Sequence, residues 1–399
     1  MVRLVRRLYA YAFLEDLILL YPVYALLFAE NGLSAAEISS LFIIWSCVTF
    51  VLEVPSGLWA DLFSRRRLLA LAPLLTGAGF ALWTWLPSYP AFAAGFVLWG
   101  AGSSLCSGTL QALVYEELAR SDAAGSYARY MGRSQALGTT AMMAATALAG
   151  PVLGAGGYQA VGLASVVVCL AGALVGRSFP ESRGALSTAV GGADGSADCS
   201  DPQEDDPGFL TVLRAGFGEL RASRAALRAV LLTSAVTGVL MIDEYVPLLV
   251  KSMDVADATV PPLMLLVAAG VAAGGWCAGR GTHRMLGPAL AVAALALAAG
   301  SVTGPWGTPL LALAFGVFQW AMVTCDAMLQ DRVTDRARAT VSSLAGFGAE
   351  VFAVLLCAGY ALGSAWWEHS TLFVLASVPY LLIALVLLRH GRKRAAKEG

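Results

Sequence analysis

The chain has little charge, little histidine and no metal-type cysteine spacing, and each shortage argues against a class of protein. Asp, Glu, Lys and Arg make up 13% of its 399 residues, whereas about 25% is usual for a soluble domain. The net charge is −1 at pH 7, and three histidines occur. We therefore expect no nucleic-acid partner and no metal centre.

The usual signatures of ATP hydrolysis and of cysteine chemistry are also missing from the sequence. No Gly-Lys-Ser/Thr phosphate-binding loop is present, so ATP-driven work by this chain alone is not expected. The seven cysteines follow neither Cys-x-x-Cys nor ligand spacing. Six of them lie in apolar runs, where cysteine commonly packs as a small side chain. We expect neither an enzyme nor a resident cofactor.

Apolar residues are abundant: 58% of the chain is hydrophobic and the mean hydropathy is +0.70. A membrane-spanning helix needs about 20 consecutive, mostly apolar residues. On this basis the sequence predicts an all-α membrane protein with twelve transmembrane helices. In the first half they cover about 8–29, 36–58, 68–86, 91–115, 133–155 and 158–176. In the second half they cover about 226–250, 260–279, 286–303, 307–329, 340–363 and 370–388.

The basic residues give these spans an orientation. With an even number of spans, every Lys and Arg except Lys251 falls in a segment on the same side of the membrane. Cytoplasmic segments of membrane proteins carry the excess of Lys and Arg. We therefore expect a multi-pass protein of the cell (cytoplasmic) membrane with both termini in the cytoplasm.

The spans divide into two six-helix bundles joined by one long connection. We predict an N-terminal bundle over 1–177, a cytoplasmic linker over 178–225, and a C-terminal bundle with a basic tail over 226–399. The first part of the linker is small, polar and acidic, as in a flexible tether. Its second part gathers Phe209, Leu213 and Phe217 on one helical face. This pattern fits an interfacial amphipathic helix or, equally, a connector packed on the bundle.

The two halves repeat one another weakly, as a duplicated unit would. Residues 275–284 align without gaps on residues 57–66, each at the inner end of the second span of a half. The first and seventh spans each carry an acidic pair followed by proline. These are Glu15 and Asp16 before Pro22, and Asp243 and Glu244 before Pro247. The repeat predicts two pseudo-symmetric six-helix halves.

The loop after the second span resembles a motif of the major facilitator superfamily, roughly Gly-x-Leu-Ala-Asp-Arg-x-Gly-Arg-Arg. Five residues match it: Gly57, Ala60, Asp61, Arg65 and Arg66. Three depart from it: Trp59, Leu62 and Ser64. The resemblance implies a gate in which contacts of Asp61 with Arg65 and with the start of the eleventh span hold the halves closed on the inner side. Glu53, just before this motif, belongs either to the gate or to a separate protonation site.

A second likeness favours one branch of that family. The stretch 150–157 is similar, with an offset, to the Gly-Pro-x-x-Gly-Gly pattern of drug:proton antiporters, and it lies in the fifth span as it does there. The fourth span lacks the arginine that those exporters carry. The branch is therefore an expectation that the fourth span does not support.

Carboxylates are the candidate working groups inside the membrane. Charged side chains at membrane depth face the bundle interior or water, because facing lipid costs a few kcal/mol. By the resemblance, spans one, four, seven and ten line a central cavity. The candidates for binding a proton or substrate are Glu15, Asp16, Asp243, Glu244, Asp326, Gln111, Gln319 and Glu350. The alternative is that these side chains only form hydrogen bonds that fix helix packing.

These observations predict a secondary transporter that works by rocking of the two halves. We expect its partners to be a small-molecule substrate, protons and the lipid bilayer, and we expect a monomer. An interior with acids and almost no bases favours a small amphipathic cationic or neutral cargo, exported against protons. The alternatives are a proton-coupled importer of a neutral nutrient and a non-transporting scaffold or receptor on the same fold.

Overall fold

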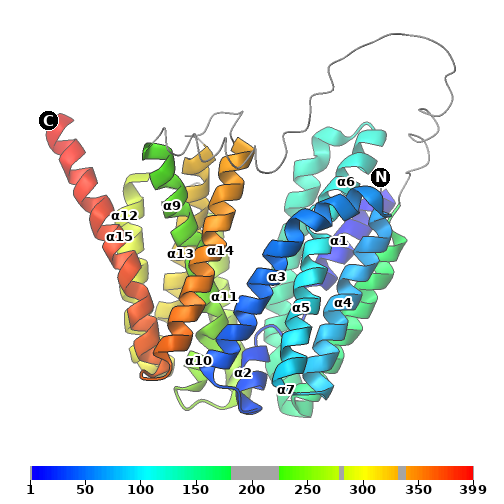
Figure 1. The fold of residues 1–399 in the computed structure, drawn as a ribbon, viewed down its shortest axis with the longest axis horizontal. Helices are drawn as coiled ribbons and strands as arrows, with labels where there is room; N and C mark the ends of the chain where they lie inside the picture. The colour runs from blue at the N-terminus through cyan, green and yellow to red at the C-terminus, as the bar shows by residue number, and fades with distance from the viewer. Residues whose placement is uncertain (1, 181–223, 278–282, 331–337, 399) are drawn as a thin grey trace, which may run out of the picture.

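The computed structural model describes residues 2–180, 224–277, 283–330 and 338–398, and within these ranges the chain forms helices and no strands (Figure 1). The predicted all-α membrane fold is confirmed. The amphipathic helix predicted in the linker lies outside the described residues.

The N-terminal half is built from seven α-helices. They are α1 (Val2–Asp16), α2 (Tyr24–Glu30), α3 (Ala35–Leu62), α4 (Arg65–Trp85), α5 (Tyr89–Cys106), α6 (Thr109–Arg120) and α7 (Tyr127–Ser178). The C-terminal half is built from seven more. They are α9 (Arg224–Gly238), α10 (Val246–Lys251), α11 (Val260–Cys277), α12 (Leu286–Val302), α13 (Thr308–Gln330), α14 (Arg338–Gly363) and α15 (His369–Glu398).

These helices make twelve membrane crossings. In the described chain, nine stretches are long and apolar enough to span a bilayer, and α12 is a shorter apolar helix. One stretch, within α7, crosses twice because the chain turns back at Gly157, where φ is +64°. A residue without Cβ adopts this backbone conformation readily. The turn brings Gly162 against Thr84, at the end of α4, and Gly176 against Leu69, near its start. The pair α1 and α2 supplies the remaining crossing.

The first and seventh crossings are interrupted beside their acidic pairs. The first is helical up to Asp16, passes through turns over residues 17–23, and resumes as α2. The seventh tightens into a 3-10 helix, η3 (Val239–Tyr245), before α10 begins. Pro22 and Pro247 lie in or just after these segments, and proline has no N–H for the helix ladder. The sequence prediction of continuous spans was wrong here.

The fourth crossing is also interrupted. It was expected to run unbroken over 91–115, but α5 ends at Cys106 and α6 begins at Thr109. Between them Gly108 has a φ of +73°, which breaks the regular helix. Beyond this break, α6 carries Glu116, whose contact with α4 is described below.

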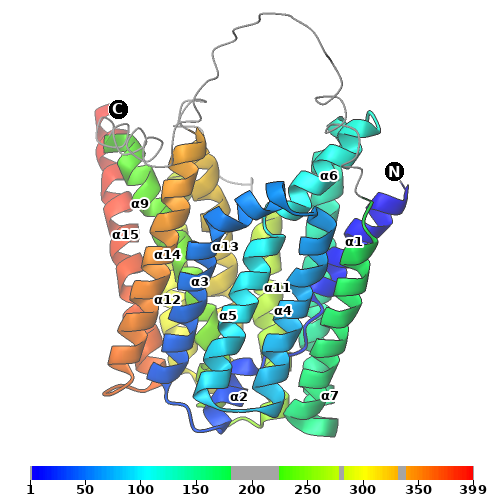
Figure 2. The same ribbon diagram turned by 45° about the vertical axis from the view of Figure 1, so that its right-hand side comes forward.

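The halves meet at one side of the molecule. We call the side where residues 2 and 398 lie the termini side, and the side of α2 and α10 the far side. Figures 1 and 2 show the halves close together at the far side and separating toward the termini. Contacts between the halves join α3 to α14, α2 to α10, and α7 to α11 and to η4 (Asp257–Thr259).

The buried cores follow the same division. One large core contains residues of both halves and includes the segments around α2 and α10. A second core, around Leu8 and Leu113, belongs wholly to the N-terminal half. A third, around Val230 and Leu344, belongs wholly to the C-terminal half. The halves therefore share apolar packing at the far side and are packed separately near the termini.

Candidate functional site

Two of the predicted acids bond across the boundary between the halves. The Tyr24 hydroxyl, at the start of α2, donates a hydrogen bond to Glu244 Oε2 in η3. The Ser46 hydroxyl on α3 donates to Glu350 Oε2 on α14. Each bond joins a neutral hydroxyl of the N-terminal half to a carboxyl of the C-terminal half. Glu350 is thus placed at the contact between halves.

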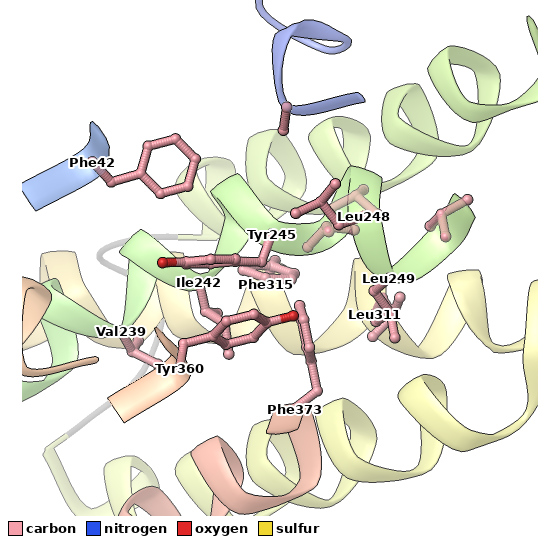
Figure 3. Close-up of a cluster of buried hydrophobic side chains, with 14 of the residues drawn as sticks. Phe42, Val239, Ile242, Tyr245, Leu248, Leu249, Leu311, Phe315, Tyr360 and Phe373 are labelled. Atoms are coloured by element: carbon pink, nitrogen blue, oxygen red, sulfur yellow. The ribbon is translucent and has the colours of Figure 1, made fainter. Parts of the chain in front are cut away.

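Tyr245, next to Glu244, makes a third bond across this boundary. Its hydroxyl donates to Ser39 Oγ on α3 at 2.7 Å. Its ring lies between Phe42 of the N-terminal half, at 5.2 Å between centroids, and Tyr360 of the C-terminal half, at 3.9 Å (Figure 3). Because the ring is fully buried, this packing holds the neighbouring Glu244 in position.

Glu15 lies at a cavity inside the N-terminal half. The cavity has a volume of about 60 Å3 and is lined by residues of α1, α4, α5 and α7 and of the segment between α1 and α2. The Glu15 carboxyl lies beside the thiol of Cys106. That thiol also lies 3.7 Å from the hydroxyl of Tyr11, which donates to Leu69 O at 3.0 Å. The cavity therefore has one carboxyl within a polar network.

An aromatic cluster adjoins both the cavity and the contact between halves. Tyr21 stacks on Trp99 at 5.3 Å, and both rings line the cavity. Trp99 also lies 6.1 Å from Tyr24, the residue that bonds Glu244, and 5.5 Å from Trp45. Trp99 and Trp45 were not among the site residues predicted from the sequence. In the sequence alone, each tryptophan fits ordinary helix packing as well as it fits a binding site.

The remaining acid of each pair, Asp16 or Asp243, does not share its neighbour's contacts, as expected for adjacent residues about 100° apart on a helix. A Cβ on Gly138 would meet the Asp16 carboxylate, so Asp16 faces the first crossing of α7. Asp243 is exposed, whereas Glu244 is half-buried. The structure thus separates the roles of Glu15 from Asp16 and of Glu244 from Asp243.

Three predicted polar residues stand apart from these contacts. Gln111 is exposed on α6, while Gln319 and Asp326 lie two turns apart on α13, half-buried and exposed respectively. Within the described chain, none of these three side chains forms a hydrogen bond or ion pair with another side chain. Their roles remain predictions.

The predicted gating motif lies at the termini side. Glu53, Gly57 and Asp61 belong to the last turns of α3, and their side chains lie outside the described residues. Arg66 is exposed, whereas Arg65 is buried and forms an ion pair with Glu116 at the end of α6. Glu116 and Glu117 also pair with Arg120. These helix-end ion pairs link α4 to α6 within the N-terminal half.

At the far side, a polar cluster closes the boundary between halves. Glu30, which ends α2, accepts a hydrogen bond from Tyr158 at 3.1 Å and is hydrogen-bonded to Asp257 of η4. Asp257 also pairs with Lys251. Partial burial raises the pKa of Glu30 above its ordinary value, and the bond to Asp257 raises it further.

Among the described residues no group of three or more His, Cys, Asp and Glu is arranged to hold a metal ion.

The chain is similar in fold to known membrane transporters. A family model described as Major Facilitator Superfamily matches residues 12–355. The solved structure of nucleoside transporter NupG has a TM-score of 0.72 at 13% identity and covers 97% of this chain and 98% of that one. The POT family transporter PepTSo has a TM-score of 0.69 at 13% identity, with 98% of each chain covered. For a D-xylose-proton symporter the TM-score is 0.63 at 14% identity, with coverage of 97% and 96%. No curated protein sequence matches the chain.

Proposed function

The chain belongs to the major facilitator superfamily, and from this premise we propose that it exports a small organic compound in exchange for protons. The proposed cargo is amphipathic and cationic or neutral, and it crosses the cytoplasmic membrane by rocking of the two halves around a central site. This assigns the chain to the drug:proton antiporter-like branch, working as a monomer with both termini in the cytoplasm.

The observation that carries the proposal is the pair of carboxyls bonded to hydroxyls across the boundary. An ionised carboxylate on Glu244 or Glu350 accepts a strong, charge-assisted bond from Tyr24 or Ser46. A proton on the same carboxyl removes its charge and weakens that bond. Proton binding then favours separation of the halves at the far side, which is the link that proton-coupled alternation needs.

The charge of the interior supports the proposed cargo. Glu15, Asp243 and Glu244 lie at membrane depth, and the ion pairs formed by described basic residues lie at helix ends. An anionic cargo would meet repulsion from these acids, whereas a cation would be attracted. A neutral cargo is compatible with either protonation state.

Transport by purified protein in liposomes tests the proposal. With an imposed pH gradient, organic cations of graded size should move against the proton flow, and collapse of the gradient should stop net movement. Glu244→Gln should strongly reduce the response to the gradient, while Glu368→Gln, the same change in an exposed loop, should leave it intact. Cation movement that ignores the gradient would reject proton coupling.

A second candidate is a proton-coupled importer of a neutral nutrient. The names of two structural neighbours, a nucleoside transporter and a D-xylose-proton symporter, favour it. Both nucleosides and xylose are uncharged. The same liposomes separate the candidates, because an importer would accumulate a neutral solute in the direction of proton flow.

A further inference from the structure

The cavity beside Glu15 has a composition that points to a ligand. Every residue that lines it belongs to the N-terminal half, so the cavity differs from a central site shared between halves. Its wall combines the Glu15 carboxyl with the rings of Tyr11, Tyr21 and Trp99, and Thr76, Ser103 and Cys106 add further polar groups. No Lys, Arg or His is among its lining residues.

These groups suit an organic cation. A carboxylate supplies the opposite charge, and the faces of tyrosine and tryptophan attract cations within about 6 Å of the ring centre. At roughly 10–15 Å3 for each water-sized group, a cavity of about 60 Å3 accepts roughly four to six such groups. That is the size of a methylated ammonium head, and smaller than a drug-sized molecule.

A hard inorganic cation fits the lining less well. Such ions prefer a shell of several oxygen ligands. Apart from the Glu15 carboxyl, the side-chain oxygens of the lining are neutral hydroxyls, those of Tyr11, Tyr21, Thr76 and Ser103. Aromatic carbons and the sulfurs of Cys106 and Cys169 form much of the remaining wall. The site thus offers one anionic ligand, and its other side-chain oxygens are uncharged hydroxyls.

We propose that this cavity is an ammonium-headgroup subsite, in which Glu15 neutralises the cation and the Tyr21–Trp99 stack walls it. The inference deepens the proposed function, on which it rests for the cargo's route, by naming the cargo as an amine or quaternary ammonium compound. The apolar part of the cargo extends out of the cavity, which is too small to contain it.

The subsite is placed to communicate with the contact between halves. Trp99 lines the cavity and lies 6.1 Å from the ring of Tyr24. Tyr24 in turn donates to Glu244 of the other half. A cation that displaces the Trp99 ring acts on this bond through a single intervening side chain.

Direct binding to the purified full-length protein tests the subsite without any gradient. The probes are methylammonium, trimethylammonium and tetramethylammonium chlorides, against sodium chloride at equal ionic strength and against neutral tert-butanol. The readouts are the thermal unfolding temperature and the quenching of tryptophan fluorescence. The variants are Glu15→Gln, Trp99→Phe, Trp99→Leu and the control Glu368→Gln.

We expect methylated ammonium ions to raise the unfolding temperature of the wild type and of Glu368→Gln, and sodium chloride and tert-butanol to have no such effect. Glu15→Gln should weaken binding at least about tenfold, and Trp99→Phe should retain more affinity than Trp99→Leu. Equal binding by Glu15→Gln, or equal stabilisation by sodium chloride or tert-butanol, would overturn the subsite. Binding with the expected variant pattern but no proton-driven flux would uphold the subsite and reject the proposed function.

Discussion

The first and seventh crossings occupy equivalent places in the two halves, yet they use their acidic pairs differently. In the first crossing, Glu15 faces a cavity and Asp16 faces α7, both within the N-terminal half. In the seventh, Glu244 bonds Tyr24 of the opposite half. Both crossings are interrupted beside the acids, by turns in one case and by a 3-10 helix in the other.

The difference suggests that one acidic pair holds a ligand and the other controls the relative position of the halves. A contact made within one half moves as a rigid unit when the halves rock, whereas a contact between halves must break. Glu15 is therefore suited to hold a ligand, and Glu244 to sense or control the relative position of the halves. Both acidic pairs occupy equivalent positions in the internal repeat. Because each crossing is interrupted differently beside its pair, the acids contact different partners.

The largest predicted effect comes from the seventh crossing, where Glu244 contacts the opposite half. Glu244→Gln removes the charge that strengthens the bond from Tyr24. A hydrogen bond to a charged group contributes roughly 1.5–3 kcal/mol, so proton-driven flux should fall about 30-fold. Flux in liposomes at a fixed pH gradient measures this, and Glu368→Gln is the control. Normal proton-driven flux in Glu244→Gln would contradict the assigned role.

Ser165→Ala should affect the first crossing without affecting the contact between halves. Ser165 Oγ accepts a hydrogen bond from the buried backbone N–H of Leu20, at 3.1 Å, in the interrupted segment. Leaving that donor unpaired should lower the free energy of unfolding by about 1.5 kcal/mol. Thermal unfolding measures the loss, with Thr140→Ala, an exposed position of the same helix, as control. The response of flux to the pH gradient should persist in both variants.

Tyr245→Phe sharpens the comparison by removing one hydroxyl at the boundary. Its bond to Ser39 joins the halves at the far side, and a neutral bond of this kind contributes about 1 kcal/mol. The population open at the far side should therefore rise about fivefold. Distances between spin labels in the loops after α2 and α10 report this. Tyr360→Phe, whose hydroxyl contacts His369 within one half, should leave the distances unchanged.

The smallest predicted effect concerns pH at the far side. Because the pKa of Glu30 is raised, the folded protein binds this proton more tightly than the unfolded chain does. The stabilisation is complete at pH values below the ordinary pKa of 4.5 and is lost as pH rises through the raised value. Since the group is only partly shielded from solvent, the effect should be about 0.5 kcal/mol or less. Unfolding temperature measured across pH should show a flatter profile in Glu30→Gln; an unchanged profile would contradict this.

Hydropathy alone predicted most of the crossings. The span expected at 260–279 matches α11 (Val260–Cys277), and that expected at 307–329 matches α13 (Thr308–Gln330). The interruptions at residues 17–23 and at Gly108 were missed, because averaged hydropathy is the same for a helix and for an apolar turn. Proline does not identify the breaks either, because Pro55, Pro73 and Pro151 lie inside helices.

The acids of the candidate site could be predicted from the sequence, but the side chains that contact them could not. Glu15, Glu244 and Glu350 were identified because carboxyls are costly in a membrane. Their partners Cys106, Tyr24 and Ser46 lie far away in the sequence, and which of them meet depends on how helices and halves pack. Trp99 was missed for the same reason, since its importance comes from its position between the cavity and Tyr24.

The location of the cavity has a consequence for how a cargo can drive the transporter. A ligand held entirely by one rigid half has the same intrinsic affinity whichever side is open. A ligand with equal affinity for two states leaves their populations unchanged, however tightly it binds. The ammonium head can therefore anchor the cargo, and the free energy that reorients the protein must come from the apolar tail reaching the other half or from the Trp99–Tyr24–Glu244 path. Two cargoes with the same head and different tails should then be transported at different rates.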